Sequence, residues 1–276
     1  MKVFTTQESL KKELAKHHGK TVGFVPTMGA LHRGHTSLLI KAKTTCDVVV
    51  GSIFVNPTQF NDPQDFQDYP IQIEADKKKL EEVGCDLLYL PENVADVYKH
   101  ESDFDVDLGI LDEVMEGTNR PGHFKGVMRV VKLLFEIVSP THTFFGLKDY
   151  QQYLIVKEMA TQLNMGIEVI GCETIRESDG LAMSSRNLLL SLNERQVATT
   201  LIKTLTYCKE HYNEQRISDL EKRCLAMMRQ YGEPEYFVIR RADNLEEVPA
   251  GYTGEVRAFV VCTVSYTHLR AHETEA

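Results

Sequence analysis

The chain has 276 residues, 42% of them hydrophobic, which is enough to bury a sizeable core in one large domain or two moderate ones. Its 31 Lys and Arg against 40 Asp and Glu give a net charge of -9, the wrong sign for a protein that holds long stretches of nucleic acid. The 6 cysteines form no CxxC pair, which argues against a disulfide framework and against a zinc knuckle.

The N-terminal stretch MKVFTTQESLKKELAKHHGK carries charges every few residues and has no apolar core of the signal-peptide kind. The longest apolar stretch, around Val48 to Val55, is too short to span a bilayer. We therefore predict a cytoplasmic protein with no membrane partner, whose cysteines are buried thiols in a reducing compartment.

Short β-branched or aromatic runs alternate along the chain with longer segments that have apolar residues at helical spacing. The runs predict buried strands at Thr21–Thr27, Asp47–Val55, Cys85–Pro91, Thr141–Gly146 and Met165–Gly171. The longer segments predict helices at His35–Thr44, Ile71–Val83, Phe124–Val138 and Tyr150–Leu163. This alternation indicates βαβ units, and hence an α/β fold in which helices cover both faces of a parallel sheet.

The pattern changes after about Thr174. Two helical segments follow, each preceded by a Ser-x-x-Glu capping box, at Ser191–Glu194 and Ser218–Glu221. Two strand-like runs, EYFVIRR and GEVRAFVVCTV, come after them. We predict a first domain over residues 1–174 and a smaller α+β domain over 175–276, with the linker near Cys172–Asp179.

The last residues, SYTHLRAHETEA, break this pattern abruptly, because an alternating apolar strand gives way to a polar stretch. We interpret residues 265–276 as a non-native tail of the kind that a translated cloning adaptor produces. His268 and His272 are accordingly left out of the candidate sites.

The segment PTMGALHRGH, Pro26–His35, follows a predicted strand and opens a predicted helix. Backbone amides at a helix N-terminus favour anions, and the imidazoles of His32 and His35 add donors that suit a triphosphate attacked at its α-phosphorus. Two histidines three residues apart also fit a surface face or half of a metal site. The absence of further ligand-spaced Cys or His nearby counts against the metal.

A second polar segment, SDGLAMSSRN, spans Ser178–Asn187 and is too polar for a core strand. One interpretation is an interdomain loop whose hydroxyl and amide groups satisfy the backbone. The other is a mobile flap that brings Ser184, Ser185 and Arg186 onto phosphates.

Together, the HxGH segment early in a βαβ domain and the later Met-Ser-Ser-Arg segment resemble the nucleotidyltransferase superfamily that includes the class I aminoacyl-tRNA synthetases. Within it, the chain resembles the pantothenate synthetase (pantoate–β-alanine ligase) family. The resemblance covers nearly the whole chain and runs through PTMGALHRGH, FVNPTQF, EADKKKL, RPGHFKGV, FFGLKDYQQ and DGLAMSSRN.

The resemblance implies a Rossmann-like first domain, ATP as co-substrate, Mg²⁺, and a homodimer. It also implies a two-step ligation. ATP and pantoate give a pantoyl adenylate and pyrophosphate, and the amine of β-alanine then displaces AMP to form pantothenate.

The resemblance also implies roles for individual residues. The residues it marks as catalytic are His35, His32, Lys148, Ser184, Ser185 and Arg186. Those it assigns to ATP binding are Met28, Gly29, Ala30, Leu31, His32, Arg33, Gly34, His35, Gly146, Leu147, Lys148, Asp149, Ile175, Met183, Ser184, Ser185 and Arg186.

The remaining implied roles concern pantoate and the metal. Gln59 and Gln152 match the pair of neutral amides that holds pantoate. Asp76 matches an acidic position near the Mg²⁺, although a lone carboxylate on a helix is more often simply solvated. Arg120 and His123 fall in a loop that borders the site, where helix capping or loop packing is an equal alternative.

No strong base is needed for the first step, because a carboxylate is already ionised, so orientation and charge stabilisation carry the expected catalysis. Two alternatives stay open on the sequence. One is a different HxGH nucleotidyltransferase that needs no β-alanine, and the other is a non-catalytic regulator that binds ATP on the same fold. A tRNA synthetase is disfavoured, because no segment remains for an anticodon-binding domain.

Overall fold

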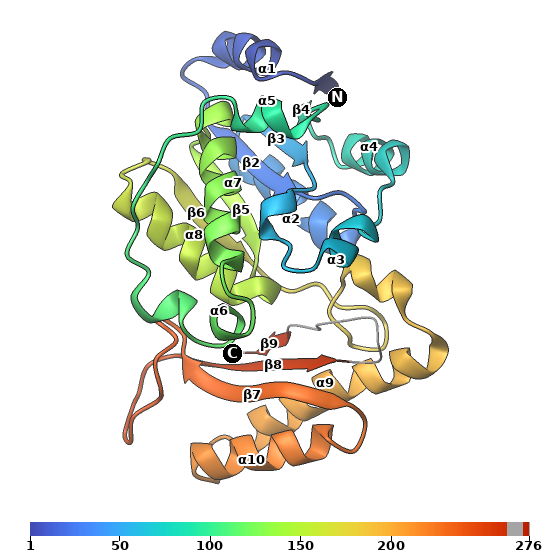
Figure 1. Ribbon diagram of the computed structural model, residues 1–276, viewed down its shortest axis with the longest axis vertical. Coiled ribbons are helices and arrows are strands. Elements are labelled where there is room, and N and C mark those ends of the chain that lie inside the picture. Colours follow the sequence, from blue (N-terminus) through green and yellow to red (C-terminus); the bar gives the residue numbers. More distant parts are fainter. Residues whose placement is uncertain (264–272, 276) are drawn as a thin grey trace. The chain divides into compact units, whose positions relative to one another are not determined.

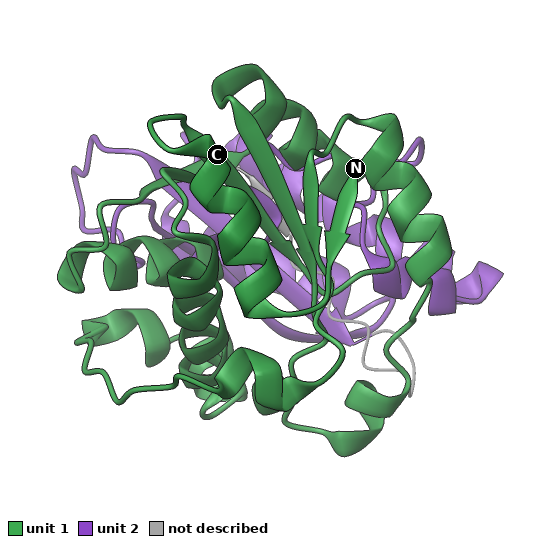
Figure 2. Ribbon diagram, turned by 90° about the horizontal axis from the view of Figure 1, so that it is seen from above, with its two compact units in different colours: residues 1–146, 152–172 green, residues 147–151, 173–276 purple. Residues whose placement is uncertain are grey.

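The structure is a computed structural model that describes residues 1–263 and 273–275. The chain divides into two compact units. Unit 1 comprises Met1–Gly146 and Gln152–Cys172, and unit 2 comprises Leu147–Gln151 and Glu173–Ala276 (Figure 2). Residues 147–151 lie within the predicted first domain but cluster with unit 2.

Unit 1 is built on a parallel sheet of 6 strands in the order β1-β4-β3-β2-β5-β6. The strands are β1 Lys2–Phe4, β2 Val22–Thr27, β3 Val48–Ile53, β4 Leu87–Tyr89, β5 His142–Gly146 and β6 Glu168–Cys172. The five strands predicted from the sequence are thus confirmed, with shorter bounds at β3 and β4. The three-residue edge strand β1 has no apolar run and was not predicted.

The central strands are apolar along their whole length because both faces of the sheet are covered. Every residue of β3 is buried, as are the first four of β2. Figure 2 shows helices on both sides of the strands of unit 1, which is the environment in which continuous Val and Ile runs replace alternation. The predicted α/β class is confirmed.

The helices of unit 1 connect and cover the strands. Their bounds are α1 Gln7–Leu14, η1 Ala15–His17, α2 Arg33–Thr45, η2 Pro57–Gln59, α3 Pro63–Gln67, α4 Ile73–Glu82, α5 Val94–Tyr98, η3 Gly109–Asp112, α6 Glu116–Asn119, α7 His123–Val138 and α8 Tyr150–Gln162, whose first two residues cluster with unit 2. The most deeply buried is α7, which packs against β2 (Figure 1). All four predicted helices are confirmed.

The strand order creates a topological switch point beside β2. After β2 the chain continues to β3 and β4 on one side, whereas β5 and β6 lie on the other. Val22–Thr27 pairs in register with Val48–Ile53, and Gly23 pairs with His142. In sheets of this kind, ligands bind at the carboxyl ends of the strands at such a point. The loops that follow β2 and β3 begin at this edge.

Unit 2 contains a second, antiparallel sheet with two long helices. Its elements are η4 Leu147–Asp149, η5 Ser185–Leu189, α9 Leu192–His211, α10 Ile217–Met228, β7 Glu233–Arg241, β8 Val256–Thr263 and β9 Glu273–Glu275. Leu201, Leu220, Phe237 and Val260 belong to one apolar core from both helices and both long strands. The α+β character predicted for this part of the chain is confirmed.

One predicted capping box exists and the other does not. Ser191 caps α9 reciprocally with Glu194. The prediction at Ser218 is wrong, because α10 begins at Ile217 and places Ser218 inside the helix. Glu221 instead accepts a hydrogen bond from the Ile239 amide at 2.7 Å and one from Arg240, so tertiary contacts with β7 decide its role.

The chain end joins the sheet of unit 2, since the backbone of β9 pairs with β8. His268 and His272 lie outside the described residues, and the interpretation of 265–276 as non-native stays a prediction. All 6 cysteines are unbridged; five are buried and Cys172 is half-buried. Burial raises the pKa of the Cys85 thiol to about 11, so it is an inert core group.

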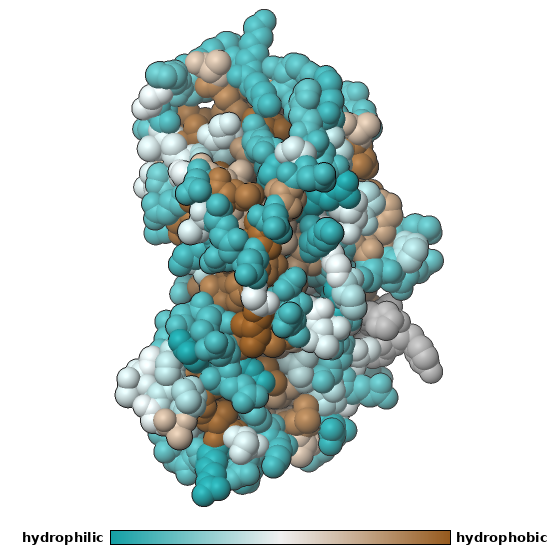
Figure 3. Space-filling model, turned by 60° about the vertical axis from the view of Figure 1, so that its left-hand side comes forward, coloured by the Kyte–Doolittle hydropathy of each residue, from teal (hydrophilic) through white to brown (hydrophobic). Residues whose placement is uncertain are grey.

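Among the described helices, none is both long and apolar enough to cross a membrane. Hydrophilic residues predominate on the face drawn in Figure 3, with smaller apolar areas between them.

Candidate active site

The two histidines of the HxGH segment cap the helix that follows β2. His32 is the N-cap residue of α2, and its Nδ1 accepts a hydrogen bond from the Gly34 amide at 3.1 Å. His35, three residues later, accepts from the His32 amide through its own Nδ1 at 3.3 Å. The rings lie with centroids 4.0 Å apart. This is a reciprocal capping box in which imidazoles take the places of Ser and Glu.

These contacts assign the proton of each neutral ring to one nitrogen. Because both Nδ1 atoms accept from backbone amides, both neutral rings carry their hydrogen on Nε2. Each ring therefore presents an Nε2 donor at the N-terminus of α2, where the helix dipole favours an anion. Both residues are only half-buried, so they are not packed away in the apolar core.

The turn before α2 is held by a buried carboxylate. Asp76, on α4, is 0% exposed, and its two oxygens accept hydrogen bonds from the amides of Ala30 at 2.8 Å and Leu31 at 2.7 Å. Lys79, one turn further along α4, donates to the Leu31 carbonyl at 2.5 Å. The α4 helix thereby fixes the Ala30–Leu31 peptide directly ahead of the histidines.

The same turn has an unusual backbone. Ala30 has φ of 49° and Gly29 has φ of 88°. A side chain at Gly29 would be strained by that φ, and its Cβ would lie 3.2 Å from Asp76 Oδ2. The left-handed conformation of Ala30 costs free energy, and the two hydrogen bonds to Asp76 offset it.

These contacts bear on the predicted metal site. Asp76 is not a solvated surface carboxylate, since its oxygens are buried and occupied by backbone amides. No group of three or more His, Cys, Asp or Glu in the described part of the chain could hold a metal ion. The described side chains thus do not form a protein-only Mg²⁺ site, and Asp76 as a metal ligand stays a prediction.

Gln59 lies beside the turn that follows β2. It ends the short helix η2, and its Nε2 is 3.1 Å from the Sδ of Met28. Asn56, which is 1% exposed, donates to Gln59 Oε1 at 3.2 Å and accepts from the Tyr98 hydroxyl at 2.7 Å. The segments PTMG and FVNPTQF, separate in the sequence, are therefore adjacent.

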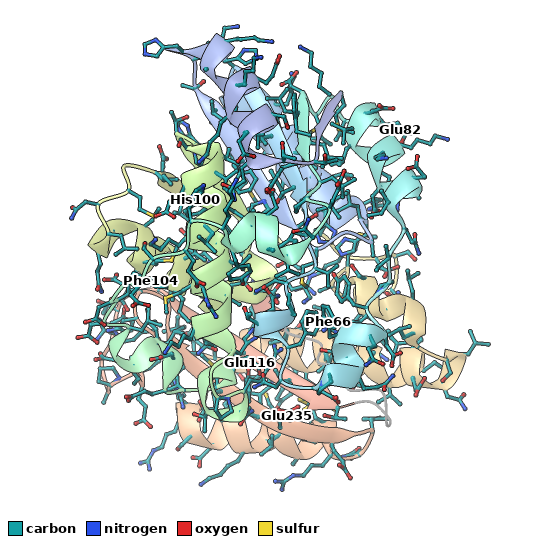
Figure 4. The ribbon with its side chains drawn as sticks, turned by 45° about the horizontal axis from the view of Figure 1, so that its top comes forward. Phe66, Glu82, His100, Phe104, Glu116 and Glu235 are labelled. Atoms are coloured by element: carbon teal, nitrogen blue, oxygen red, sulfur yellow. The ribbon has the colours of Figure 1, made fainter. Side chains whose placement is uncertain are left out.

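The RPGHF segment contacts the same residue from the other side. His123 begins α7, and its Nδ1 lies 2.8 Å from the Gln59 carbonyl oxygen. Arg120 places Nη1 3.2 Å from His123 Nε2 and 3.8 Å from the carboxylate of Glu116, the α6 residue labelled in Figure 4. Arg120 and His123 thus position Gln59.

Close packing of α7 makes this arrangement possible. A Cβ added to Gly126 would lie 2.4 Å from the carbonyl oxygen of Thr58, within η2. Only glycine lets the helix approach the η2 backbone this closely.

The remaining predicted residues of FFGLKDYQQ lie around the start of α8. Gln152 is a half-buried residue of unit 1, and Gly146 ends β5. Lys148 and Asp149 belong to η4 of unit 2 and form an ion pair at 3.3 Å. Tyr150 ties this segment to the rest of unit 2 by donating to the Ala242 carbonyl at 3.0 Å and by lying under Arg257.

The Met-Ser-Ser-Arg segment is anchored within unit 2. The Met183 amide donates to the Ile175 carbonyl at 2.9 Å, which brings these two predicted residues together. Ser184 caps η5 by accepting from the Arg186 amide at 3.3 Å, and Ser185 is buried. The segment is therefore an ordered turn entering a short helix.

An ion-pair cluster supports this turn. Arg195 of α9 binds Asp179 at 2.7 Å and Glu177 at 3.2 Å. Its guanidinium holds the pKa of both carboxyl groups below their usual values. These charged residues were not singled out in the sequence, because nothing local links positions 177, 179 and 195.

Comparison with known proteins covers almost the entire chain. Residues 2–271 match the model of the pantoate-beta-alanine ligase family. A pantothenate synthetase of Cytophaga hutchinsonii is 44% identical over 93% of this chain and 90% of its own length. Another, from Thermodesulfovibrio yellowstonii, is 49% identical over 74% of this chain and 72% of its own length.

Solved structures agree with the sequence relatives. The pantothenate synthetase of Thermus thermophilus is similar with a TM-score of 0.91 and 35% identity, over 100% of this chain and 99% of that one. The pantoate-beta-alanine ligase of Francisella tularensis, complexed with beta-gamma ATP and beta-alanine, has a TM-score of 0.79 and 29% identity, over 100% of this chain and 97% of that one. The chain belongs to the pantoate-beta-alanine ligase family.

Proposed function

We propose that the chain joins pantoate to β-alanine at the expense of ATP, through a pantoyl adenylate, and releases AMP and pyrophosphate. The observation that carries this proposal is the histidine capping box at the start of α2. It places two imidazoles at the N-terminus of the helix that follows the central strand β2, and a helix N-terminus at the carboxyl end of such a strand favours the phosphates of a nucleotide.

In the first step the pantoate carboxylate attacks the α-phosphorus of ATP, and pyrophosphate leaves with the bridging oxygen. Negative charge grows on the oxygens of the departing pyrophosphate. The Nε2 donors of His32 and His35 and the amides at the start of α2 stabilise this charge, because they are already oriented before the reaction begins.

Lys148, Ser184, Ser185 and Arg186 supply further phosphate contacts in this proposal. Lysine is a compact point charge on a flexible stem, whereas arginine offers a planar fork of donors that suits phosphate oxygens. The ordered cap at Ser184 supports the assignment, because it sets the backbone of Arg186 in one conformation.

Gln59 and Gln152 hold pantoate through its hydroxyl and carboxylate oxygens. The contacts of Gln59 with Asn56, Met28 and His123 support this role, because they fix a neutral amide beside the turn after β2. A neutral amide orients the carboxylate without stabilising its ground state as strongly as a cation does.

In the second step the amine of β-alanine attacks the carbonyl carbon of the adenylate. The new carbon–nitrogen bond forms as the carbon–oxygen bond to AMP breaks, and AMP keeps the bridging oxygen. The amine must lose a proton before it attacks.

Mg²⁺ and the homodimer are part of the same proposal. The ion would enter with the nucleotide, as Mg²⁺ commonly does in nucleotide sites, and would neutralise part of the phosphate charge. The poor donor set of the described side chains supports this mode over a protein-only site. Light scattering tests the homodimer, because the measured molar mass should be twice the mass of one chain.

The test of the function is an assay with each substrate left out in turn. AMP should form only when ATP, pantoate and β-alanine are all present in multiple turnovers, and pyrophosphate should form with ATP and pantoate alone in a single turnover. ADP and phosphate as products would contradict the adenylate. AMP formation that does not require β-alanine would favour a different nucleotidyltransferase. ATP binding without turnover would favour a non-catalytic regulator.

A further inference from the structure

The segment Ser184–Arg186 is held by the side chain of the residue that follows it. Asn187, which is 9% exposed, donates from Nδ2 to the Ala182 carbonyl at 3.0 Å and to Glu177 Oε1 at 2.9 Å. The first bond closes the chain across the motif, and the second attaches it to the preceding strand-like stretch. The position of the motif therefore depends on where Glu177 is held.

Glu177 is held in turn by Arg195. Nη1 of Arg195 donates to Glu177 Oε1 at 3.2 Å, and Nη2 lies 3.2 Å from Oε2 of the same carboxylate. Nε donates to Asp179 Oδ2 at 2.7 Å, and Asp179 accepts from the Leu181 amide through its other oxygen. One guanidinium thus engages both acidic residues of the turn that leads into the motif.

Arg195 lies at a position where a cation is normally unfavourable, so its two carboxylate partners matter for its stability. Arg195 is in the first turns of α9, near the positive end of the helix dipole, where a cation is disfavoured. Two carboxylates offset that cost. The cluster is also only partly exposed, with 26% of the Arg195 side chain accessible, so its hydrogen bonds are protected from water more than those of a surface pair.

We propose that Arg195 is a positioning residue for the ligation reaction: through Glu177 and Asn187 it fixes Ser184–Arg186 in the conformation that binds the reacting phosphates. This inference rests on the proposed function, in which that segment contacts the nucleotide. A displacement of the motif by about 1 Å is enough to lower turnover roughly 100-fold. In this proposal Arg195 acts through these residues and not by contact with the substrate.

The chain supplies a matched control in Arg241. It lies in the same unit, binds Asp243 and Glu246 at 2.8 Å each, and has a side chain 25% exposed, close to that of Arg195. Its partners do not contact the Met-Ser-Ser-Arg segment. R241Q therefore removes a two-carboxylate cluster of the same unit, although its carboxylates are more exposed than those of the Arg195 cluster, and leaves the contacts of the motif in place.

The first measurement is steady-state turnover of R195Q, R195K and R241Q. R195Q should lower kcat by about 10- to 100-fold, with KM for pantoate and ATP changed by less than about threefold. R195K should recover part of the loss, because one ammonium replaces part of the fork. R241Q should match the unchanged protein. Equal kcat values for R195Q and R241Q would overturn the inference.

The second measurement separates positioning from general stability. In an Arg186→Ala background, R195Q should lower kcat by a clearly smaller factor than it does in the unsubstituted protein, because part of the effect of Arg195 acts through the Arg186 side chain that is already removed. A full additional loss would show that Arg195 acts elsewhere, and would overturn the inference.

The third measurement does not depend on turnover. Amide hydrogen exchange at Met183, Arg186 and Asn187 should accelerate in R195Q and stay unchanged in R241Q, since these amides donate within the turn. Unchanged exchange in R195Q would refute the inference even if the enzyme works as proposed. Failure of the unsubstituted protein to form AMP would instead refute the proposed function.

Discussion

At the scale of single residues, the central feature is that His32 and His35 are both structural caps and candidate catalysts. The cap consumes their Nδ1 lone pairs and leaves Nε2 as the donor nitrogen of each neutral ring. The two roles are therefore separable by substitution, because asparagine caps a helix well but cannot reproduce the donor at Nε2.

His32→Asn should keep the stability of the protein, whereas His32→Ala should lower the free energy of unfolding by about 1 kcal/mol. Both should lower kcat by roughly 100-fold, the effect typical of one lost donor to a developing anion. Urea unfolding and AMP release measure the two effects. Turnover of His32→Asn at the level of the unsubstituted protein would show that the ring is only a cap.

Asp76 has a structural role that is testable beside its predicted role at the metal, because it is buried and accepts two backbone hydrogen bonds. Asp76→Asn should lower the free energy of unfolding by about 2 kcal/mol, because one buried backbone amide then faces an NH₂ group instead of an oxygen. Glu74→Gln, on the same helix with a side chain 87% exposed, is the control and should change stability little. If added Mg²⁺ restored the turnover of Asp76→Asn, that result would instead support the prediction that Asp76 is a metal ligand.

At the scale of elements, the contact between α7 and η2 decides how Gln59 is held. Gly126→Ala should push η2 away, because the new Cβ would lie 2.4 Å from the Thr58 carbonyl oxygen. We expect a loss of about 1–3 kcal/mol in stability and a higher KM for pantoate. Lys125→Ala, at the neighbouring exposed position of α7, is the control. An unchanged KM for pantoate would show that the position of Gln59 does not affect pantoate binding.

The cluster around Arg195 predicts a dependence of stability on pH. Arg195 lowers the pKa of Glu177 from 4.5 and that of Asp179 from 3.8, so the cluster stabilises the fold above these values and is lost as pH falls through the lower folded values. The stability difference between the unsubstituted protein and R195Q should be largest near about pH 7 and should shrink by about pH 3. A difference that grows on acidification would contradict this assignment.

Elements were largely predictable from the sequence, because the signals for them are local. Buried parallel strands appear as apolar runs, and helices show apolar residues at their own spacing. The exception at Ser218 shows the limit: a Ser-x-x-Glu pattern looks like a cap, but the packing of Ile217 against the core of unit 2 starts α10 earlier.

The site was predictable only as a set of motifs. Sequence shows that His32 and His35 open a helix, but not that they cap it reciprocally. Sequence also does not show that Asp76 is buried and accepts a hydrogen bond from the Ala30 amide, which becomes visible once α4 is placed against that turn. Asn56 contacts Tyr98, and Arg195 contacts Asp179, across long sequence separations, and one sequence alone does not reveal such contacts.

At the scale of the whole molecule, the fold and the family lead to one expectation, which concerns the phosphorus atom of ATP that is attacked. A ligase of this fold is proposed to activate a carboxylate by attaching it to the α-phosphorus of ATP, so one carboxylate oxygen must end in AMP. Cleavage at the γ-phosphorus would send the same oxygen into inorganic phosphate.

The most direct test is therefore to supply pantoate with an ¹⁸O-labelled carboxylate and to weigh the products by mass spectrometry. The account predicts one ¹⁸O atom in AMP, one in the amide carbonyl of pantothenate, and none in pyrophosphate. Unlabelled AMP, or label in inorganic phosphate, would contradict it.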